Sequence, residues 1–366
     1  MKKTTTIILL LLTAITLFGN TNYYKLIRNA EQKIVDKQLD SSIYYYKEAF
    51  IKYNYPFVKD LLAASCIAIH TNDTTTLYTF LELLLNKGMS EKELEYFVKK
   101  KPNDKRILAF KTNFDNYNNY YLSTIDYQLN KKFRDIDKNN QIWLQSKNKA
   151  DSICQLYTYT KLTKQFIDLV KQNGYPTERR VGLGSLSTIM YSNEEHPHSK
   201  NNWLLDSINL PFLKSKRLTK SFFKYSHKNT TICFLMSRRG NAYLWHVDLR
   251  KAPELDSILL KGIQNCEVYP TFYAARRERS GDDYGLVFMS AANMKYNYNL
   301  KKIIKSTIAE KINSNRANIG IRSLEQDLAL FNAIAILENL KYKDFFRPRI
   351  KCSNLLYSAL FTSALP

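Results

Sequence analysis

The densest group of ionisable side chains in the sequence is the run Glu194-Glu195-His196-Pro197-His198. Two imidazoles beside two carboxylates can bind a metal ion or serve as general acid and base, because histidine titrates near neutral pH. The proline between the two histidines is equally typical of an exposed, solvated loop that does no chemistry. We take His196 as the candidate acid or base and leave the loop interpretation open.

A second group combines acids with arginine. Glu278 and Arg279 precede a DDYG turn that contains Tyr284. Arginine binds phosphate or carboxylate through paired hydrogen bonds, so Arg279 is a candidate anion clamp and Glu278 a candidate partner for His196 in a hydrolytic site. A mixed charged turn explains the same residues, and both interpretations stay open.

The sequence lacks the signatures of common enzyme and metal sites. It has no GxSxG, HExxH, GxxxxGK or GxGxxG. The cysteines are Cys66, Cys154, Cys233, Cys266 and Cys352. They form no CxxC pair and no metal-ligand spacing, and an odd number cannot all pair internally. We therefore predict no metal site and no cofactor.

The elements that position these groups begin with an internal repeat at an offset of 34 residues. Tyr23, Ile27, Ala30, Tyr46, Ala49 and Phe50 recur as Phe57, Leu61, Ala64, Phe80, Leu83 and Leu84. Spacings of three and four place these positions on one helix face, and a period of 34 is typical of tetratricopeptide hairpins. Two hairpins need a neighbour to cover their apolar faces.

The rest of the chain is mostly helical in pattern. Helical spacing from Glu91 to Gln141, broken once at residues 101–104, indicates a degenerate third unit and a connecting helix. Further helices are predicted from about Ala150 to Gln172, before the run NGYP, and at residues 254–263 and 324–340. Alternation over residues 231–248 around an Arg-Gly-Asn turn predicts a small β-hairpin.

These patterns predict a mainly α protein, with N-terminal tetratricopeptide-like helical hairpins followed by a mostly helical α+β domain with a small β-hairpin. We place the repeat at residues 21–133, the C-terminal domain at residues 134–346 and a tail at residues 347–366.

The first twenty residues have the order of a secretory signal peptide. Lys2 and Lys3 precede an apolar stretch from Ile7 to Phe18, and Gly19 offers a small residue near the cleavage point. The apolar stretch is shorter than the roughly twenty residues that a membrane span needs. We predict residues 1–20 to be a signal, the protein to be exported to the periplasm or secreted, and the mature chain to lack a transmembrane segment.

The chain is strongly basic. Its 55 Lys and Arg residues against 33 Asp and Glu residues give a net charge of +22. Such a surface attracts nucleic acid, anionic lipid or acidic polysaccharide, with an affinity that falls as salt rises. A low-GC genome produces the same scattered lysines, so a dedicated polyanion function and a mere bias in composition both stay open.

The order of several short motifs resembles a family of exported bacterial proteins with tetratricopeptide repeats and a C-terminal domain of unknown function. The segments NGYPTERRVG, EVYPTFYAARRER and DDYG carry the resemblance. It implies that polar positions recur at Asn140-Gln141, His196, Glu278-Arg279 and Tyr284-Gly285. Asn140 and Glu278 replace aspartates of that pattern. Such a set fits a small polar pocket or a buried hydrogen-bond network, and the family implies no reaction.

Three functional hypotheses follow. The first is a binding protein whose concave helical surface takes a protein or peptide partner, with Gln141, Tyr284 and the aromatic Tyr46 as binding residues. The second is a hydrolase-like enzyme that uses His196, Glu278 and Arg279. The third is a binder of an anionic envelope polymer or nucleic acid. The oligomeric state stays open.

Overall fold

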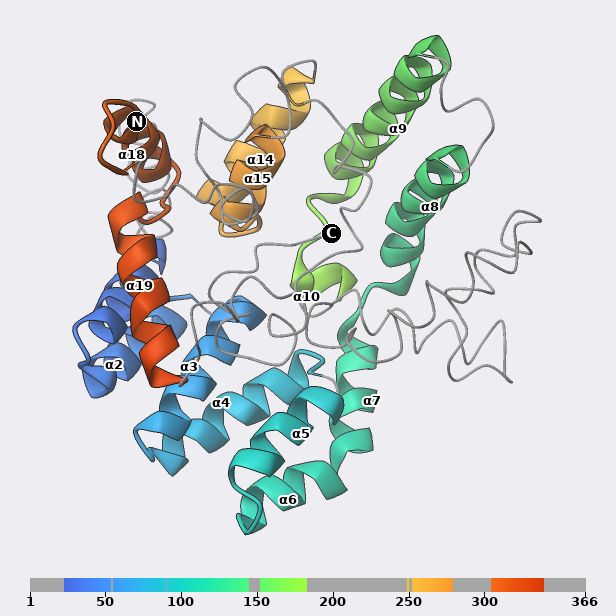
Figure 1. The fold of residues 1–366 in the computed structure, drawn as a ribbon. Coiled ribbons are helices and arrows are strands. Elements are labelled where there is room, and N and C mark those ends of the chain that lie inside the picture. The colour runs from blue at the N-terminus through green and yellow to red at the C-terminus, as the bar shows by residue number, and fades with distance from the viewer. Residues whose placement is uncertain are drawn as a thin grey trace, which may run out of the picture.

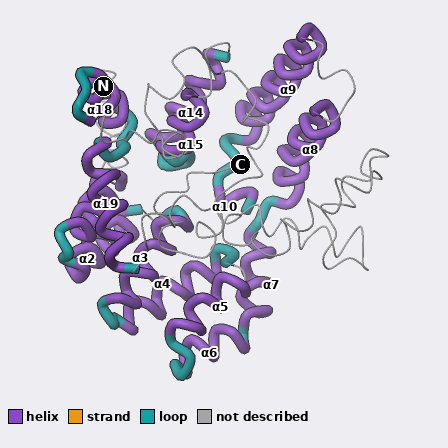
Figure 2. Tube along the Cα trace, in the orientation of Figure 1, coloured by secondary structure: helices purple, strands orange, loops and turns teal. Residues whose placement is uncertain are grey.

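The computed structural model describes residues 23–53, 55–89, 91–144, 152–182, 249, 252–278 and 304–338. Within these ranges the chain is almost entirely helix joined by short loops, and no strand occurs among them (Figure 2). The prediction of a mainly α fold is confirmed. The predicted β-hairpin at residues 231–248, the signal at residues 1–20 and the tail at residues 347–366 lie outside the described ranges.

The N-terminal part forms two successive helical hairpins at the positions of the internal repeat. A first helix over residues 23–35 is followed by α2 (Leu39–Lys52), and α3 (Val58–His70) by α4 (Thr74–Asn86). The loops within the hairpins are so short that each pair must run antiparallel, and α3 packs against both α2 and α4. The predicted helical hairpins are thus present, while their membership of the tetratricopeptide class stays a prediction.

Several of these helices end in the same backbone motif. After the first helix, α3 and α4, one residue adopts a left-handed φ, of 59° at Lys37, 56° at Asn72 and 92° at Gly88. In each case the next amide donates to the carbonyl five residues earlier, which is the Schellman closure of a helix. Asp73 then caps α4, because its side chain accepts from the amide of Thr76.

A run of short helices occupies the place of the predicted degenerate third unit. These are α5 (Glu91–Lys100), α6 (Lys105–Thr112) and α7 (Phe114–Thr124), followed by α8 (Tyr127–Leu144). The predicted break at residues 101–104 is confirmed, but the expectation of a single break was wrong. Asn113 ends α6, and Asp126 starts α8 by accepting from the amide of Leu129. Short polar caps outweigh the helical spacing here.

The remaining described helices complete the fold (Figure 1). α8 packs against α9 (Ser152–Asn173), with the rings of Phe133 and Phe166 5.3 Å apart. α9 ends at the predicted NGYP run, where Gly174 has φ 79°. The short α10 (Glu178–Val181) follows, and then come α14 (Pro253–Gln264), α15 (Pro270–Glu278), α18 (Ile308–Asn318) and α19 (Leu324–Leu337). No helix in the described ranges is long and apolar enough to cross a membrane.

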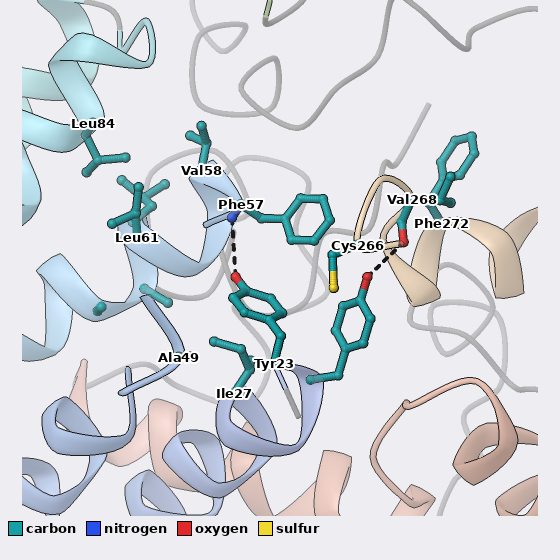
Figure 3. Packing of buried hydrophobic residues seen from close by; sticks show 14 of the residues in the cluster. Tyr23, Ile27, Ala49, Phe57, Val58, Leu61, Leu84, Cys266, Val268 and Phe272 are labelled. Carbon is teal, nitrogen blue, oxygen red and sulfur yellow. Dashed lines mark hydrogen bonds between the residues drawn. The ribbon is translucent and has the colours of Figure 1, made fainter. Parts of the chain in front are cut away.

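Helix α3 lies at the centre of the packing. From Val58 to Ala68 every residue is buried, whichever way it points. A helix covered on all sides belongs to a core, and part of this cover comes from far along the chain. Tyr24 donates to the carbonyl of Val268 over 3.1 Å, and Tyr53 donates to that of Cys266 over 2.6 Å. Figure 3 shows Phe57, just before α3, pointing toward Cys266 and Val268 in the segment that joins α14 to α15. The hydrophobic core therefore runs continuously across the predicted boundary at residues 133 and 134.

Candidate functional site

Most residues of the predicted catalytic and binding set lie outside the described part of the chain. His196, Arg279 and Tyr284 fall in ranges that the structure does not describe. Gln141 is placed only as backbone within α8, and Glu278 as the last residue of α15. A site built from these five residues therefore stays a prediction. Whether they form a polar pocket or a buried hydrogen-bond network stays open.

Tyr46 was expected to offer its ring to a partner, and this expectation needs correction. Its side chain is 0% exposed and lies in the core, beside Phe50 at a centroid distance of 5.9 Å. The exposed aromatic of the same run is Tyr44, at 58%. The physical reason is the helical period, because Tyr46 is the repeat-matched position that faces the neighbouring hairpin and Tyr44 points away from it.

The structure reveals instead a buried cluster of ionisable side chains at the beginning of α3. The carboxylate of Asp60 accepts hydrogen bonds from the hydroxyl of Tyr23 at 2.6 Å and from that of Tyr269 at 3.2 Å. Next to it, the ammonium nitrogen of Lys59 lies 3.5 Å from the centre of the Tyr269 ring, in cation–π geometry. The repeat and α15 thus meet through polar groups as well as apolar ones.

A chain of ion pairs continues from this cluster to α18 and α19. Arg322 bonds both Glu31, on the first helix, and Asp327, whose Oδ1 lies 2.7 Å from Arg322 Nε. Arg316 is only 1% exposed and pairs with the other oxygen of Asp327. Burial opposes ionisation of Asp327, yet the two arginines prevail and lower its pKa. The pairs fix the turn between α18 and α19 against the first helix.

A small cavity opens where these segments meet. It is lined by residues of the first helix, α3, the start of α15 and the turn at residues 320–322. The free space inside is about 20 Å³, and the cavity is partly open to the outside. Three cations, Arg28, Lys59 and Arg322, face it with a single acid, Glu31. We call this site the cationic cavity.

Two of the three cations at the cavity form no direct ion pair within the described ranges. Arg322 is paired with Glu31 and Asp327. Neither Arg28 nor Lys59 forms a hydrogen bond or ion pair with any residue in the described ranges. Arginine and lysine seldom stay unpaired when partly or wholly buried. The cavity therefore has the charge and the free donors to hold an anionic group.

Burial shifts the titration of the groups around the cavity. Removal from water lowers the pKa of Lys59 to about 8, with the charge of Asp60 opposing the shift. Removal from water also raises the pKa of Asp60 to about 6, against the opposing effect of Lys59. Burial lowers the pKa of Arg28, which still stays a cation at neutral pH. Near pH 7 a fraction of Lys59 is a neutral amine.

A second buried lysine, Lys87, lies near the beginning of α3. We call its surroundings the Lys87 cluster (Tyr55, Lys87, Glu178 and Arg179). The ammonium nitrogen of Lys87 lies 2.8 Å from the centre of the Tyr55 ring. Glu178 accepts from the amide of Val58 at 3.1 Å and so caps α3. Burial lowers the pKa of Lys87 to about 7 and raises that of Glu178 to about 7.

The available signal for the cationic cavity was the adjacent pair Lys59-Asp60 within a segment that is otherwise apolar. The sequence interpretation used this segment only for its repeat positions. The partners of the pair are distant in the chain, with Tyr269 lying 209 positions from Asp60. The sequence around Lys59 does not predict which distant residues contact Lys59 and Asp60.

No group of three or more His, Cys, Asp and Glu side chains that could hold a metal ion occurs in the described ranges. The prediction that the chain binds no metal and no cofactor stays a prediction. The chemistry that these ranges offer is that of lysine, arginine, carboxylate and tyrosine around one small cavity.

Within the described ranges, the fold and the site together define an all-helical protein that carries a cationic cavity. The chain matches no family model, no curated protein and no solved structure. The resemblance to exported repeat proteins accordingly stays a prediction, and the function must come from the residues themselves.

Proposed function

We propose that the chain is a helical-repeat binding protein whose cationic cavity takes an anionic group of its partner, a carboxylate of a protein or peptide. One observation carries the proposal: three cations line the cavity with one acid, and Arg28 and Lys59 form no direct ion pair in the described ranges. A carboxylate suits the geometry because guanidinium groups bind it through paired hydrogen bonds.

The proposed location and partner rest on the sequence. The signal predicted at residues 1–20 would direct the protein to the periplasm or outside the cell, and its partner would then be an exported or envelope protein. The net charge of +22 would attract acidic partners over a distance before the cavity selects among them. The repeat supplies the rigid frame that keeps the cations in place.

Binding of an anionic envelope polymer is the second candidate, and the same net charge favours it. The two functions differ in their dependence on salt. A polymer bound over the basic surface releases many counter-ions, so its affinity falls steeply with salt. The affinity for a single carboxylate in the cavity should fall far less as the salt concentration rises. The hydrolase hypothesis rests on His196, Glu278 and Arg279, and no side chain in the described ranges adds support to it.

The test is calorimetric titration of the full chain with an acidic peptide that ends in a free carboxylate, at two salt concentrations. The Arg28→Ala variant removes a half-buried cation of the cavity, and Lys25→Ala removes an exposed one from the same helix. We expect Arg28→Ala to weaken binding about tenfold, or about 1.4 kcal/mol, and Lys25→Ala to change it less than twofold.

Two results would count against the cavity. Equal losses in Arg28→Ala and Lys25→Ala would indicate attraction to the general surface charge. Binding that vanishes at the higher salt in all three proteins would favour the polymer. An amidated peptide of the same sequence separates the terminal carboxylate from acidic side chains.

A further inference from the structure

Lys59 differs from an ordinary lysine in position and surroundings. It lies in the first turn of α3, is 9% exposed, and lines the cationic cavity. Its nitrogen rests on the Tyr269 ring and has no hydrogen-bond acceptor in the described ranges. An amine in such a place is desolvated and open to a small molecule that enters the cavity.

The chemical consequence is nucleophilicity. A lysine with its ordinary pKa of 10.5 is almost wholly protonated at pH 7, whereas a pKa of about 8 leaves roughly a tenth of Lys59 neutral. The neutral amine is the reactive form, and desolvation is a common way to activate a lysine for reaction with carbonyl compounds.

We propose that Lys59 forms an imine with a small carbonyl compound that carries a carboxylate, of which a 2-oxo acid is the simplest kind. The carboxylate would pair with Arg28 and Arg322, and the carbonyl carbon would meet the amine. The inference rests on the proposed function, because it uses the same cavity and the same anion-binding cations. The small free space of about 20 Å³ favours the smallest such acids.

The reaction balances without any further reagent. The nitrogen lone pair of Lys59 attacks the carbonyl carbon, and the carbonyl π electrons move to oxygen, which takes a proton to give a carbinolamine. The hydroxyl group then leaves as water, and the nitrogen lone pair forms the C=N bond. Amine and carbonyl thus yield imine and one water molecule. Glu31 lines the same cavity and can pass a proton between nitrogen and oxygen.

Lys87 is the matched comparison within the chain. It too is buried, and burial lowers its pKa to about 7. It lies on the Tyr55 ring and does not line the cationic cavity. A low pKa alone would make both lysines react, whereas the cavity and its arginines make Lys59 the only one of the two that forms the imine.

The experiment incubates the full chain with glyoxylate and cyanoborohydride, which reduces an imine to a stable amine, and locates the adduct by peptide mass mapping. In the wild type we expect Lys59 to be modified at least tenfold faster than the exposed Lys25. Lys59→Arg should abolish this adduct, and Lys87→Arg should keep it. Because the site-by-site rates come from the wild type, the test stands even if Lys59→Arg folds poorly.

The outcomes separate this inference from the proposed function. Modification of Lys59 no faster than that of Lys25, or none at all, overturns the imine. Glycolate carries the carboxylate without the carbonyl, and it should slow the trapping at Lys59 by occupying the cavity. If glycolate binds by calorimetry and Lys59 gives no adduct, only the imine fails. If glycolate and the acidic peptide both fail to bind, the cavity as an anion site fails too.

Discussion

The cationic cavity and the Lys87 cluster both lie beside α3 and contain the same kinds of residue. They differ in whether the buried lysine lines the cavity. Each places a buried lysine on a tyrosine ring, with Lys59 on Tyr269 and Lys87 on Tyr55. Of the two lysines, Lys59 lines the cationic cavity together with two arginines, and Lys87 does not line it. We infer from this difference that a buried lysine is a candidate binding residue only where it lines a cavity. Elsewhere it is part of the packing.

The two regions also differ in the polar interactions that hold their residues in place. The cationic cavity is backed by the ion pairs that link Glu31, Arg322, Asp327 and Arg316. The Lys87 cluster is supported by the bond from the Val58 amide to Glu178, which caps α3. The cavity should therefore lose the most stability when a charge is removed, and the Lys87 cluster should respond mainly to pH.

The largest effect should come from Asp327→Ala. This change leaves Arg316 and Arg322 buried without their shared acid, and breaking a buried pair in this way costs about 3–5 kcal/mol. Guanidinium denaturation measures the loss. The control Asp36→Ala removes an exposed acid that pairs with Lys33, and it should cost under about 1 kcal/mol. Similar losses in both variants would show that the buried pairs do not support the cavity.

Tyr23→Phe should have the next largest effect. It removes the hydrogen bond to the Asp60 carboxylate at 2.6 Å, and bonds to charged groups contribute about 1.5–3 kcal/mol. Tyr46→Phe is a matched control, since Tyr46 is also fully buried but its hydroxyl has no hydrogen-bond partner in the described ranges. That variant should keep or slightly raise the free energy of unfolding. An equal loss in the two variants would contradict the role of Asp60.

Glu178→Gln should change the pH dependence of stability. The pKa of Glu178 is raised from 4.5 to about 7, so its stabilising contribution is complete below about pH 4.5 and is lost as pH rises through 7. Glutamine cannot ionise. The fall in unfolding free energy between pH 4.5 and 8 should therefore be smaller in the variant, by at most about 3 kcal/mol, the full effect of a pKa raised from 4.5 to about 7. Parallel curves for the two proteins would contradict this assignment.

Arg179→Ala should have the smallest effect. Arg179 is exposed, and its guanidinium carbon lies 5.8 Å from the Tyr55 ring centre. We expect a change in unfolding free energy within about 0.5 kcal/mol. Binding of the acidic peptide should change less than twofold, against about tenfold for Arg28→Ala. A loss of binding as large as that of Arg28→Ala would erase the distinction between the two regions.

The fold could be predicted where local rules decide it. The repeat-matched residues are buried except Phe50, which is partly buried, and Leu83, which is 36% exposed. Helix α9 ends at the predicted NGYP run. The start of α19 at Leu324 was also predicted, and a capping box between Ser323 and Gln326 fixes it. The breaks at Asn113 and Asp126 were missed, because single polar caps interrupted a helical pattern that otherwise continued.

The site could not be predicted in the same way. Lys59 and Asp60 are close in sequence, but Tyr269 and Arg322 come to them only through tertiary packing. Periodicity reports which face of a helix is buried and says nothing about which distant polar group meets it. The groups picked for their local density, around His196 and Glu278, have side chains outside the described ranges and stay predictions.

The most direct test of the central claim is a crystal structure of the full chain soaked in bromide, a small anion that anomalous scattering locates without ambiguity. We expect a bromide ion in the cationic cavity, within contact distance of Arg28 and Lys59, and no such ion at the Lys87 cluster. Bromide bound only to exposed lysines and arginines, with the cavity holding none, would contradict the account.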